Sequence, residues 1–171
     1  MLYIFKNVLN KVLVVYILLV TLMLTFSMMN SAIAGKISPT NRTILLDASG
    51  ETTMLTTQKL MQGQRKFNES CAQCHIDGGS KTNPDVDLGQ LSLANATPAR
   101  NHVEGIVDYL HDPTSYDGLQ SLSEFHPSMQ RADLFPRMRG LSEDDLSAIA
   151  GYILAEPQII GEQWAGGKPK R

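Results

Sequence analysis

Cysteine is scarce in this chain: there are two among 171 residues, and they stand close together as Cys71 and Cys74. A disulfide between them would close so short a loop that it would be strained and would stabilise the fold little. A structural zinc site needs about four ligands, and only the few histidines of the chain are left to complete one. The two cysteines therefore need a different explanation.

An excess of positive charge is also lacking. The chain carries 15 lysines and arginines against 17 aspartates and glutamates, and two of the basic residues, Lys6 and Lys11, lie before Gly35. From Gly35 onward the net charge is therefore −4, which disfavours nucleic acid as a partner. The sequence contains no internal repeat, low-complexity tract or second domain boundary, so we expect residues 35–171 to form one domain.

The first 34 residues have the pattern of a secretory signal peptide. The two lysines give a positive start, residues 12–26 form an apolar run interrupted only by two threonines, and Ala32-Ile33-Ala34 is a small-residue cleavage site. A retained membrane anchor is the alternative, because the apolar run approaches the length that spans a bilayer. The cleavage site and the polar shift after it favour removal, so we expect residues 1–34 to be cleaved before Gly35.

Capping signals and periodicity predict a mostly helical domain that begins with a small β-hairpin. Residues 43–57 form two short strands around a turn at 48–51, where Gly50 can adopt a positive φ. Thr56 or Thr57 can then cap a helix that ends at the cysteines. Its inner face is marked by residues at spacings of three and four, namely Leu60, Gly63, Phe67 and Cys71.

The rest of the domain is predicted as a long loop and two helices. Residues 76–100 contain glycine and proline breaks and no sustained period, which predicts mostly loop. Asn101 is expected to cap a short helix that ends at Pro113, with Glu104 reaching back to it as in a capping box. The last helix begins after Ser142 with an acidic first turn, and its apolar stripe ends before Pro157.

Cys71, Cys74 and His75 form a C-x-x-C-H motif at the end of the first predicted helix. A thioredoxin-like dithiol would need a strand–helix–strand setting, whereas here a helix precedes the cysteines and a glycine-rich segment follows. Zinc would need more ligands, and no second close pair is present. Covalent haem accounts for all three residues, because both thiols add to porphyrin vinyl groups and the histidine is placed under the iron.

Helix packing agrees with the haem interpretation. A glycine inside a helix costs about 1 kcal/mol unless a neighbouring element uses the missing side chain. Gly63 is therefore expected to pack against the last helix, near Gly151 and Tyr152. Crossed N- and C-terminal helices around a haem are typical of small monohaem c-type cytochromes, and the sequence resembles that class.

The second axial position of the iron has several candidates, namely Met129, Met138, His102, His111 and His126. The first two histidines lie at the two ends of a predicted helix, and we expect them to be solvated. His126 differs, because Pro127 fixes a segment long enough to fold over the haem face opposite His75, 51 residues earlier. The spacing alone leaves the choice open.

Several segments within residues 35–168 carry a more specific signal: CAQCHIDGGSKTNPDVDL, LANATP, VEGIVDYL, DPTSYDG, FHPSMQRADLFPRMRGLSEDDLSAIAGYILAEP and WAGGK. Together they resemble the PsbV family, the extrinsic low-potential c-type cytochromes of photosystem II. The resemblance implies a small monohaem c-type cytochrome fold with an N-terminal β-hairpin. It also implies one covalently bound haem c, with thioethers at Cys71 and Cys74 and axial ligands His75 and His126.

The resemblance further implies a subunit that is not an enzyme. It would lie in the thylakoid lumen, peripheral to the membrane, in contact with the photosystem II core and other extrinsic subunits. There it would stabilise the manganese–calcium cluster and its retention of calcium and chloride. The final KPKR differs from the tyrosine-containing tail of some members.

Two other functions compete with this one. A diffusible electron carrier of the lumen or periplasm would share the haem and the export signal, and co-purification with photosystem II would separate the two. A haem peroxidase would require His126 not to bind iron, because two histidine ligands leave no open position for peroxide.

Overall fold

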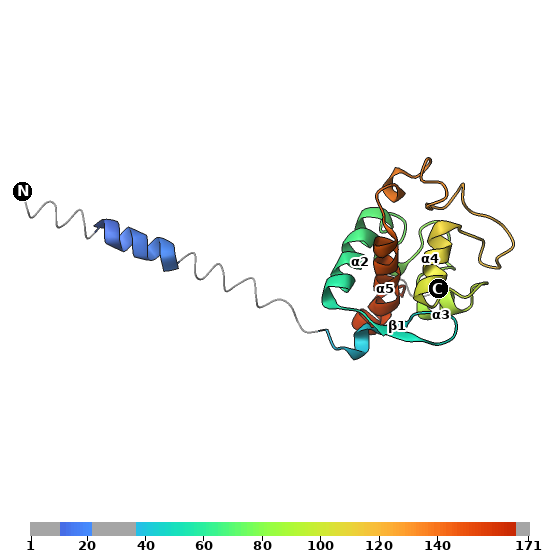
Figure 1. Ribbon diagram of the computed structural model, residues 1–171, viewed down its shortest axis with the longest axis horizontal. Coiled ribbons are helices and arrows are strands. Elements are labelled where there is room, and N and C mark those ends of the chain that lie inside the picture. The colour runs from blue at the N-terminus through green and yellow to red at the C-terminus, as the bar shows by residue number, and fades with distance from the viewer. Residues whose placement is uncertain (1–10, 22–36, 167–171) are drawn as a thin grey trace, which may run out of the picture. The chain divides into compact units, whose positions relative to one another are not determined.

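The computed structural model describes residues 11–21 and 37–166 (Figure 1). Residues 11–21 form a helix with exposed side chains, and the residues from Ile37 onward form a separate unit. The predicted cleavage site, Ala32-Ile33-Ala34, and the final KPKR lie outside the described residues, so the removal of residues 1–34 stays a prediction. Within the described ranges, no helix combines the length and apolar character that crossing a membrane requires.

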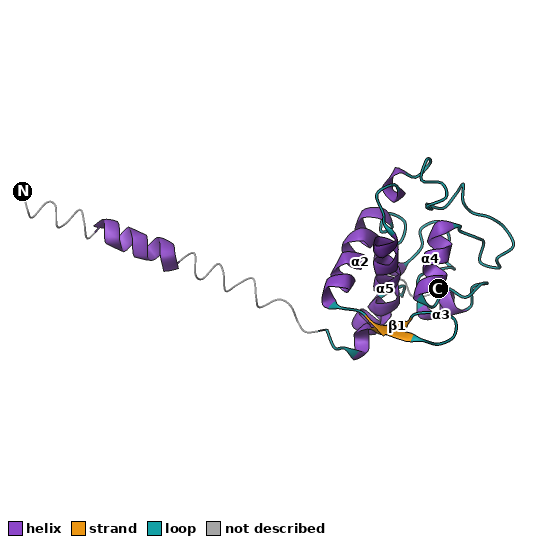
Figure 2. Cartoon of the chain, in the orientation of Figure 1, coloured by secondary structure: helices purple, strands orange, loops and turns teal. Residues whose placement is uncertain are grey.

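The predicted β-hairpin is present (Figure 2). It follows a short 3-10 turn, η1 (Thr40–Arg42), and consists of β1 (Thr43–Leu45) paired antiparallel with β2 (Thr52–Met54). Gly50 adopts a φ of 93° in the turn, as its predicted role requires. Ile44, opposite Thr53 in the sheet, is 4% exposed and fixes the hairpin to the core.

Helix α2 (Thr57–Ser70) begins and ends as the sequence predicts. The Thr56 side chain caps it by accepting a hydrogen bond from the Lys59 N–H at 3.0 Å. Leu60, Gly63 and Phe67 are its buried residues, and Cys71 is its C-cap. The cysteine motif therefore lies at the end of this helix, at the edge of the core.

Helix α5 (Glu143–Ile160) has the predicted start and extends beyond its apolar stripe. Ser142 and Asp145 form a complete capping box, with Ser142 Oγ accepting from the Asp145 N–H at 3.2 Å. The apolar stripe lies before Pro157, as predicted, but the helix itself continues through the proline to Ile160. Every residue from Ala148 to Glu156 is buried, and we attribute the continuation to this packing, which offsets the roughly 3 kcal/mol that an internal proline costs.

The segment from residue 76 to residue 100 is mostly loop, as predicted, with two short helices in it. These are η2 (Ile76–Gly78) and α3 (Gln90–Ala94), the second formed around buried Leu93. Helix α4 (Val103–His111) follows, and the 3-10 turns η3 (Pro136–Met138) and η4 (Gly161–Gln163) flank α5.

The predicted cap of α4 is also wrong. Its N-cap is His102 rather than Asn101, and no side chain caps it. The Glu104 N–H instead donates to the Leu46 carbonyl at the hairpin, at 3.1 Å. A tertiary contact thus satisfies a free N–H group in the first turn of α4, where the local sequence predicted a capping box.

The core lies where α5 packs between α2 and α4 (Figure 1). An ideal Cβ built at Gly63 of α2 would lie 2.0 Å from the carbonyl oxygen of Ala148 and 2.8 Å from Cβ of Tyr152, both on α5. The two backbones can approach this closely because the side chain is missing. Gly151 faces elsewhere, since an ideal Cβ built there would lie 2.9 Å from Cδ2 of Leu55.

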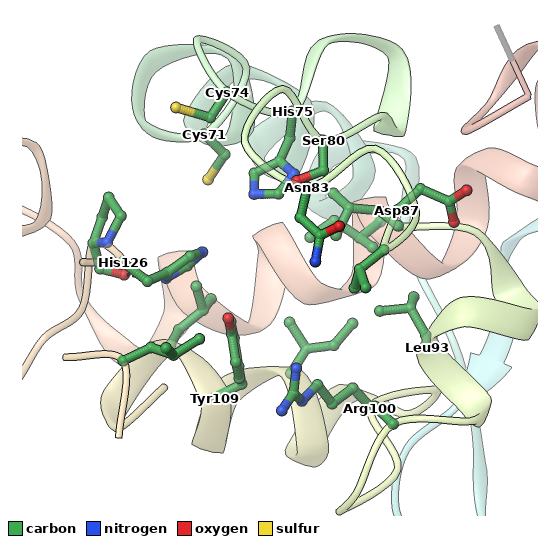
Figure 3. A pocket seen from close by; sticks show the side chains of 18 of the residues that line it. Cys71, Cys74, His75, Ser80, Asn83, Asp87, Leu93, Arg100, Tyr109 and His126 are labelled. Atoms are coloured by element: carbon green, nitrogen blue, oxygen red, sulfur yellow. Dashed lines mark hydrogen bonds between the residues drawn. The ribbon is translucent and has the colours of Figure 1, made fainter. Parts of the chain in front are cut away.

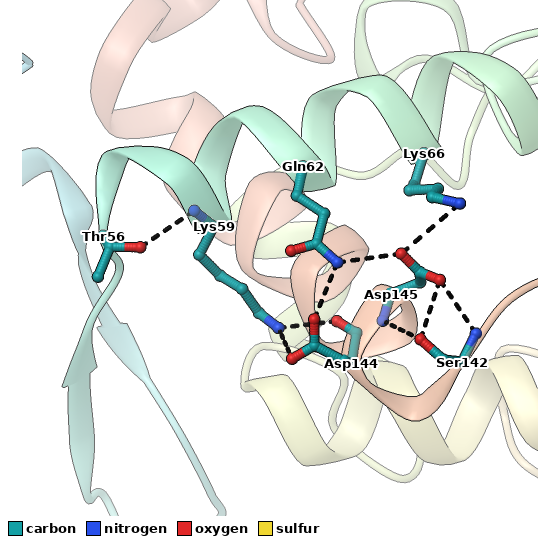
Figure 4. Close-up of polar contacts among 7 residues, drawn as sticks. All are labelled: Thr56, Lys59, Gln62, Lys66, Ser142, Asp144 and Asp145. Atoms are coloured by element: carbon teal, nitrogen blue, oxygen red, sulfur yellow. Dashed lines mark hydrogen bonds and ion pairs between the residues drawn. The ribbon is translucent and has the colours of Figure 1, made fainter.

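Polar contacts fix the relative position of α2 and α5 at the start of α5 (Figure 4). Lys59 pairs with the Asp144 carboxylate, and the Gln62 amide donates to Asp144 at 2.9 Å and to Asp145 at 3.0 Å. Lys66 lies 3.7 Å from Asp145. Hydrogen bonding from Gln62, then from the Ser142 backbone, lowers the pKa of Asp145 to about 2, so this link is ionised at neutral pH.

The substitution Gly63→Ala tests the close approach of the helices. Because its methyl group would overlap the Ala148 carbonyl, we expect the free energy of unfolding to fall by about 2 kcal/mol, as overpacked interiors do. Gly140→Ala is the control, since nothing lies within 4 Å of its Cβ position, and its effect should stay below about 0.5 kcal/mol. Urea unfolding followed by circular dichroism measures both, and equal losses in the two variants would contradict the packing argument.

Candidate functional site

The C-x-x-C-H segment turns sharply at the end of α2. The Cys71 N–H still donates to the Phe67 carbonyl at 2.7 Å, as in the helix. The N–H groups of Cys74 and His75 then both donate to the Cys71 carbonyl, at 3.1 and 3.0 Å. One carbonyl thus holds a turn that places both cysteines and the histidine in the wall of a single cavity (Figure 3).

This cavity has a volume of about 520 Å³. Its apolar wall comes from α2, α3, α4, α5 and η3, through Phe67, Leu93, Ile106, Leu110, Met138 and Ile153. The loop after the motif adds a small polar rim of Ser80, Thr82 and Asn83. An apolar cavity with few polar groups suits a largely apolar cofactor better than a polar substrate.

His75 and His126 face each other across the cavity, with ring centroids 6.1 Å apart and ring planes inclined by 51°. His75 Nδ1 donates to the Gly79 carbonyl at 3.0 Å, and His126 Nδ1 donates to the Pro127 carbonyl at 2.9 Å. A carbonyl can only accept, so each ring keeps its lone pair on Nε2. Since a histidine–metal bond is about 2 Å long, the separation leaves room for one metal ion between the rings.

Burial tunes the titratable groups of the cavity. It lowers the pKa of His75 and, with a smaller effect from the charged form of His75, lowers that of His126 to about 4. Both imidazoles are therefore neutral near pH 7, the form that binds metal. Burial and then the neighbouring Cys74 raise the pKa of the Cys71 thiol to about 12, so this environment does not support a reactive thiolate.

The other predicted ligand candidates lie in different surroundings. His111 is partly exposed, and its Nε2 lies 3.1 Å from Oε2 of Glu143. The expectation that His102 is solvated is wrong, because it is only 9% exposed and its ring lies against Gly105 at the start of α4. Met138 is 2% exposed and lines the cavity, whereas Met129 packs at the edge of the core. The structure thus brings His126 and Met138 to the cavity.

Two residues of the cavity were missed by the sequence analysis. Tyr109 packs its ring edge-on against His126, with centroids 5.0 Å apart and planes at 64°, and the Arg100 guanidinium lies 4.1 Å from the Tyr109 ring centroid. Tyr109 could have been found, since it follows Ile106 by three positions and so lies beside the apolar stripe of α4. Arg100 precedes that helix in an irregular segment, and no local pattern marks it.

Sequence comparison gives close relatives over most of the chain. The model of the cytochrome c-550 domain matches residues 35–171. A protein of Cyanothece sp. named "Photosystem II extrinsic protein V" is 50% identical over 152 residues, which are 88% of this chain and 94% of the relative. The protein of the same name from Trichodesmium erythraeum is 51% identical over 155 residues, 91% of this chain and 94% of its own.

Structural comparison agrees. The crystal structure of cytochrome c549 superposes with a TM-score of 0.73 at 48% identity, covering 75% of this chain and 99% of that one. The PsbV2 cytochrome from Thermosynechococcus elongatus gives a TM-score of 0.61 at 28% identity, over 72% and 87% of the two chains. These matches confirm the predicted fold, a mostly α, small c-type cytochrome. They also confirm the family that the sequence motifs indicated. The chain belongs to the cytochrome c-550 family.

Proposed function

We propose that this chain is a haem-bearing extrinsic subunit on the lumenal side of photosystem II. The name shared by relatives that are about half identical over nearly the whole chain supports this assignment. The main structural support for a haem is that His75 of the C-x-x-C-H turn faces His126, and that each ring has its Nε2 lone pair free. A haem fits this arrangement better than any polar ligand does.

Different residues of the cavity would hold different parts of one haem c. Cys71 and Cys74 would hold the haem through thioethers, and His75 and His126 would bind its iron. When bound, the haem supplies a one-electron ferric–ferrous couple. The chain excludes water with its apolar wall and holds both imidazoles in the neutral, Nε2-presenting tautomer through the carbonyls of Gly79 and Pro127.

Saturated coordination determines what the subunit can do. With two histidines on the iron, no position would remain for dioxygen or peroxide, and the subunit would act by binding rather than by catalysis. It shields the lumenal face of the complex, stabilises the manganese–calcium cluster and helps retain calcium and chloride. Its immediate partners are the photosystem II core and the other extrinsic subunits.

The proposed location rests on the leader, which indicates export, together with the name of the relatives, which indicates photosystem II. Residues 1–34 act as a cleaved export signal, and residues 35–171 form the single cytochrome c domain, which lies in the thylakoid lumen, peripheral to the membrane.

Export and maturation can be tested by intact mass. The protein isolated from its native membranes should have the mass of residues 35–171 plus one haem, and the haem should stay attached in acidified acetone because thioethers are covalent. A measured mass that includes residues 1–34 would show that the leader is retained, and extraction of the haem would show that it is not covalently bound.

Axial ligation can be tested by exchanging the ligand type. His126→Met should keep a low-spin haem and raise its midpoint potential, because a thioether stabilises ferrous iron relative to an imidazole. Absorption spectra and redox titration measure both effects.

Met138→Leu is the matched control for the ligand test, since Met138 also lines the cavity. It should leave the ligand spectrum unchanged, whereas His126→Ala should change it. The reverse pattern would show that Met138, not His126, is the ligand.

The proposed role can be tested by reconstitution. The purified protein should rebind to photosystem II from which the extrinsic subunits have been removed, and oxygen evolution at limiting calcium and chloride should recover with it. Rebinding should weaken with added salt, because charged contacts at the rim of an interface are screened. Recovery per bound cytochrome should be the same for the ferric and ferrous proteins, since the role is structural.

The outcomes of reconstitution separate the alternatives. A protein that does not rebind would instead be a diffusible electron carrier. Recovery restricted to one redox state would rule out a purely structural role. A rapid spectral change on adding peroxide to the native protein would point to an open axial position and hence to a peroxidase.

A further inference from the structure

The wall of the cavity contains a buried cation. Arg100 lies between α3 and α4, is only 8% exposed and lines the cavity. Figure 3 shows its guanidinium on the side of Tyr109, across the cavity from the cysteine motif. Because an arginine stays charged in a protein interior, its positive charge needs a counterion or a dense set of acceptors.

The contacts of Arg100 use only part of its donor capacity. Nη2 donates to the Thr114 carbonyl at 3.0 Å, to Thr114 Oγ1 at 3.2 Å and to the Ser115 carbonyl at 2.8 Å. The Tyr109 ring covers one face of the guanidinium. Nε and Nη1 form no hydrogen bond with any residue that the structure describes. Neither nitrogen is fully buried, so both can still be reached. These two nitrogens are therefore available to a ligand.

No carboxylate within the described ranges forms a salt bridge with Arg100. Among the described residues that line the cavity, Asp87 is the one acid. Its Oδ1 accepts from the Gly89 N–H at 2.9 Å, and its carboxylate points away from Arg100 in Figure 3. Burial lowers the pKa of Arg100, as expected for a cation that has lost water without gaining an anion.

We propose that Arg100 binds a carboxylate of the cavity's occupant, namely a propionate of the haem. This inference rests on the proposed function, because it requires a haem in the cavity. A haem carries two propionates, and the planar fork of an arginine matches a carboxylate with two parallel hydrogen bonds. The bonds to Thr114 and Ser115 hold the guanidinium in place before the ligand arrives.

The pairing has a consequence for redox. A propionate anion stabilises ferric iron, which is more positive than ferrous iron, and a paired guanidinium cancels part of that effect. The Tyr109 ring lies between Arg100 and His126, the proposed iron ligand, and contacts both. Removing its charge should therefore favour the ferric haem.

The test compares three variants of the haem-bearing protein. At a fixed ambient potential, Arg100→Gln should raise the ferric-to-ferrous ratio about tenfold, which is a midpoint about 59 mV lower for one electron. Arg100→Lys keeps the charge, so its ratio should stay within about twofold of the native protein. Both should unfold more easily than the native protein, because both lose contacts to the backbone carbonyls of Thr114 and Ser115.

Arg42→Gln is the matched control. Arg42 also donates to backbone carbonyls, those of Ile37 and Leu55, but it does not line the cavity. It should lose stability without a change in potential. An unchanged potential in Arg100→Gln, or an equal shift in Arg100→Lys, would overturn the proposal.

A crystal structure of the native haem-bearing protein tests the pairing without any substitution. A propionate oxygen within hydrogen-bond distance of Arg100 Nε or Nη1 is expected, and two propionates that both avoid Arg100 would overturn the inference. Failure of the proposed function would look different, since the native protein would then lack a covalent haem or the spectrum of two histidine ligands.

Discussion

The close approach of α2 and α5 at Gly63 is the constraint on which the rest of the structure depends. With no side chain at this position, the α2 backbone lies directly against the Ala148 carbonyl of α5, and the pairs from Lys59, Gln62 and Lys66 to Asp144 and Asp145 set the register of the two helices. Two turns further along α2, the chain reaches Cys71. The crossing therefore decides where the cysteine motif leaves the core and which way the cavity opens.

The second half of the site depends on long-range contacts rather than on a helix. His126 lies in an irregular segment whose position is fixed by backbone hydrogen bonds, from its own N–H to the Leu122 carbonyl at 2.8 Å and from the Met129 N–H to the Leu110 carbonyl at 2.9 Å. The second bond ties the segment to the end of α4. His126 thus owes its place to the packing of α4 on α5, and its tautomer to the carbonyl of Pro127.

The sequence was informative where the chemistry is local. Thr56, Ser142 and Gly50 each act within a few residues of themselves, and all three have the predicted roles. The motif from Cys71 to His75 is local as well, and the structure places it in the cavity wall. Prediction failed where a distant partner decides. The Leu46 carbonyl replaces the predicted cap of α4. The short helix α3 around buried Leu93 and the continuation of α5 past Pro157 have no local signal in the sequence either.

Arg100, which the sequence analysis did not identify, affects the charge of the same cavity as the two histidines. Both imidazoles are neutral, and Arg100 is the one lysine or arginine among the described residues that line the cavity, with no carboxylate paired to it. With the proposed haem in place, the two propionates outweigh the single positive charge that ferric iron leaves on the porphyrin, so the ferric group is a monoanion and the ferrous group a dianion. The pair of ferric haem and Arg100 would then be neutral, while the pair with ferrous haem would keep a negative charge that burial penalises. Burial and the imidazole pair therefore act in the same direction, toward ferric iron and a low potential.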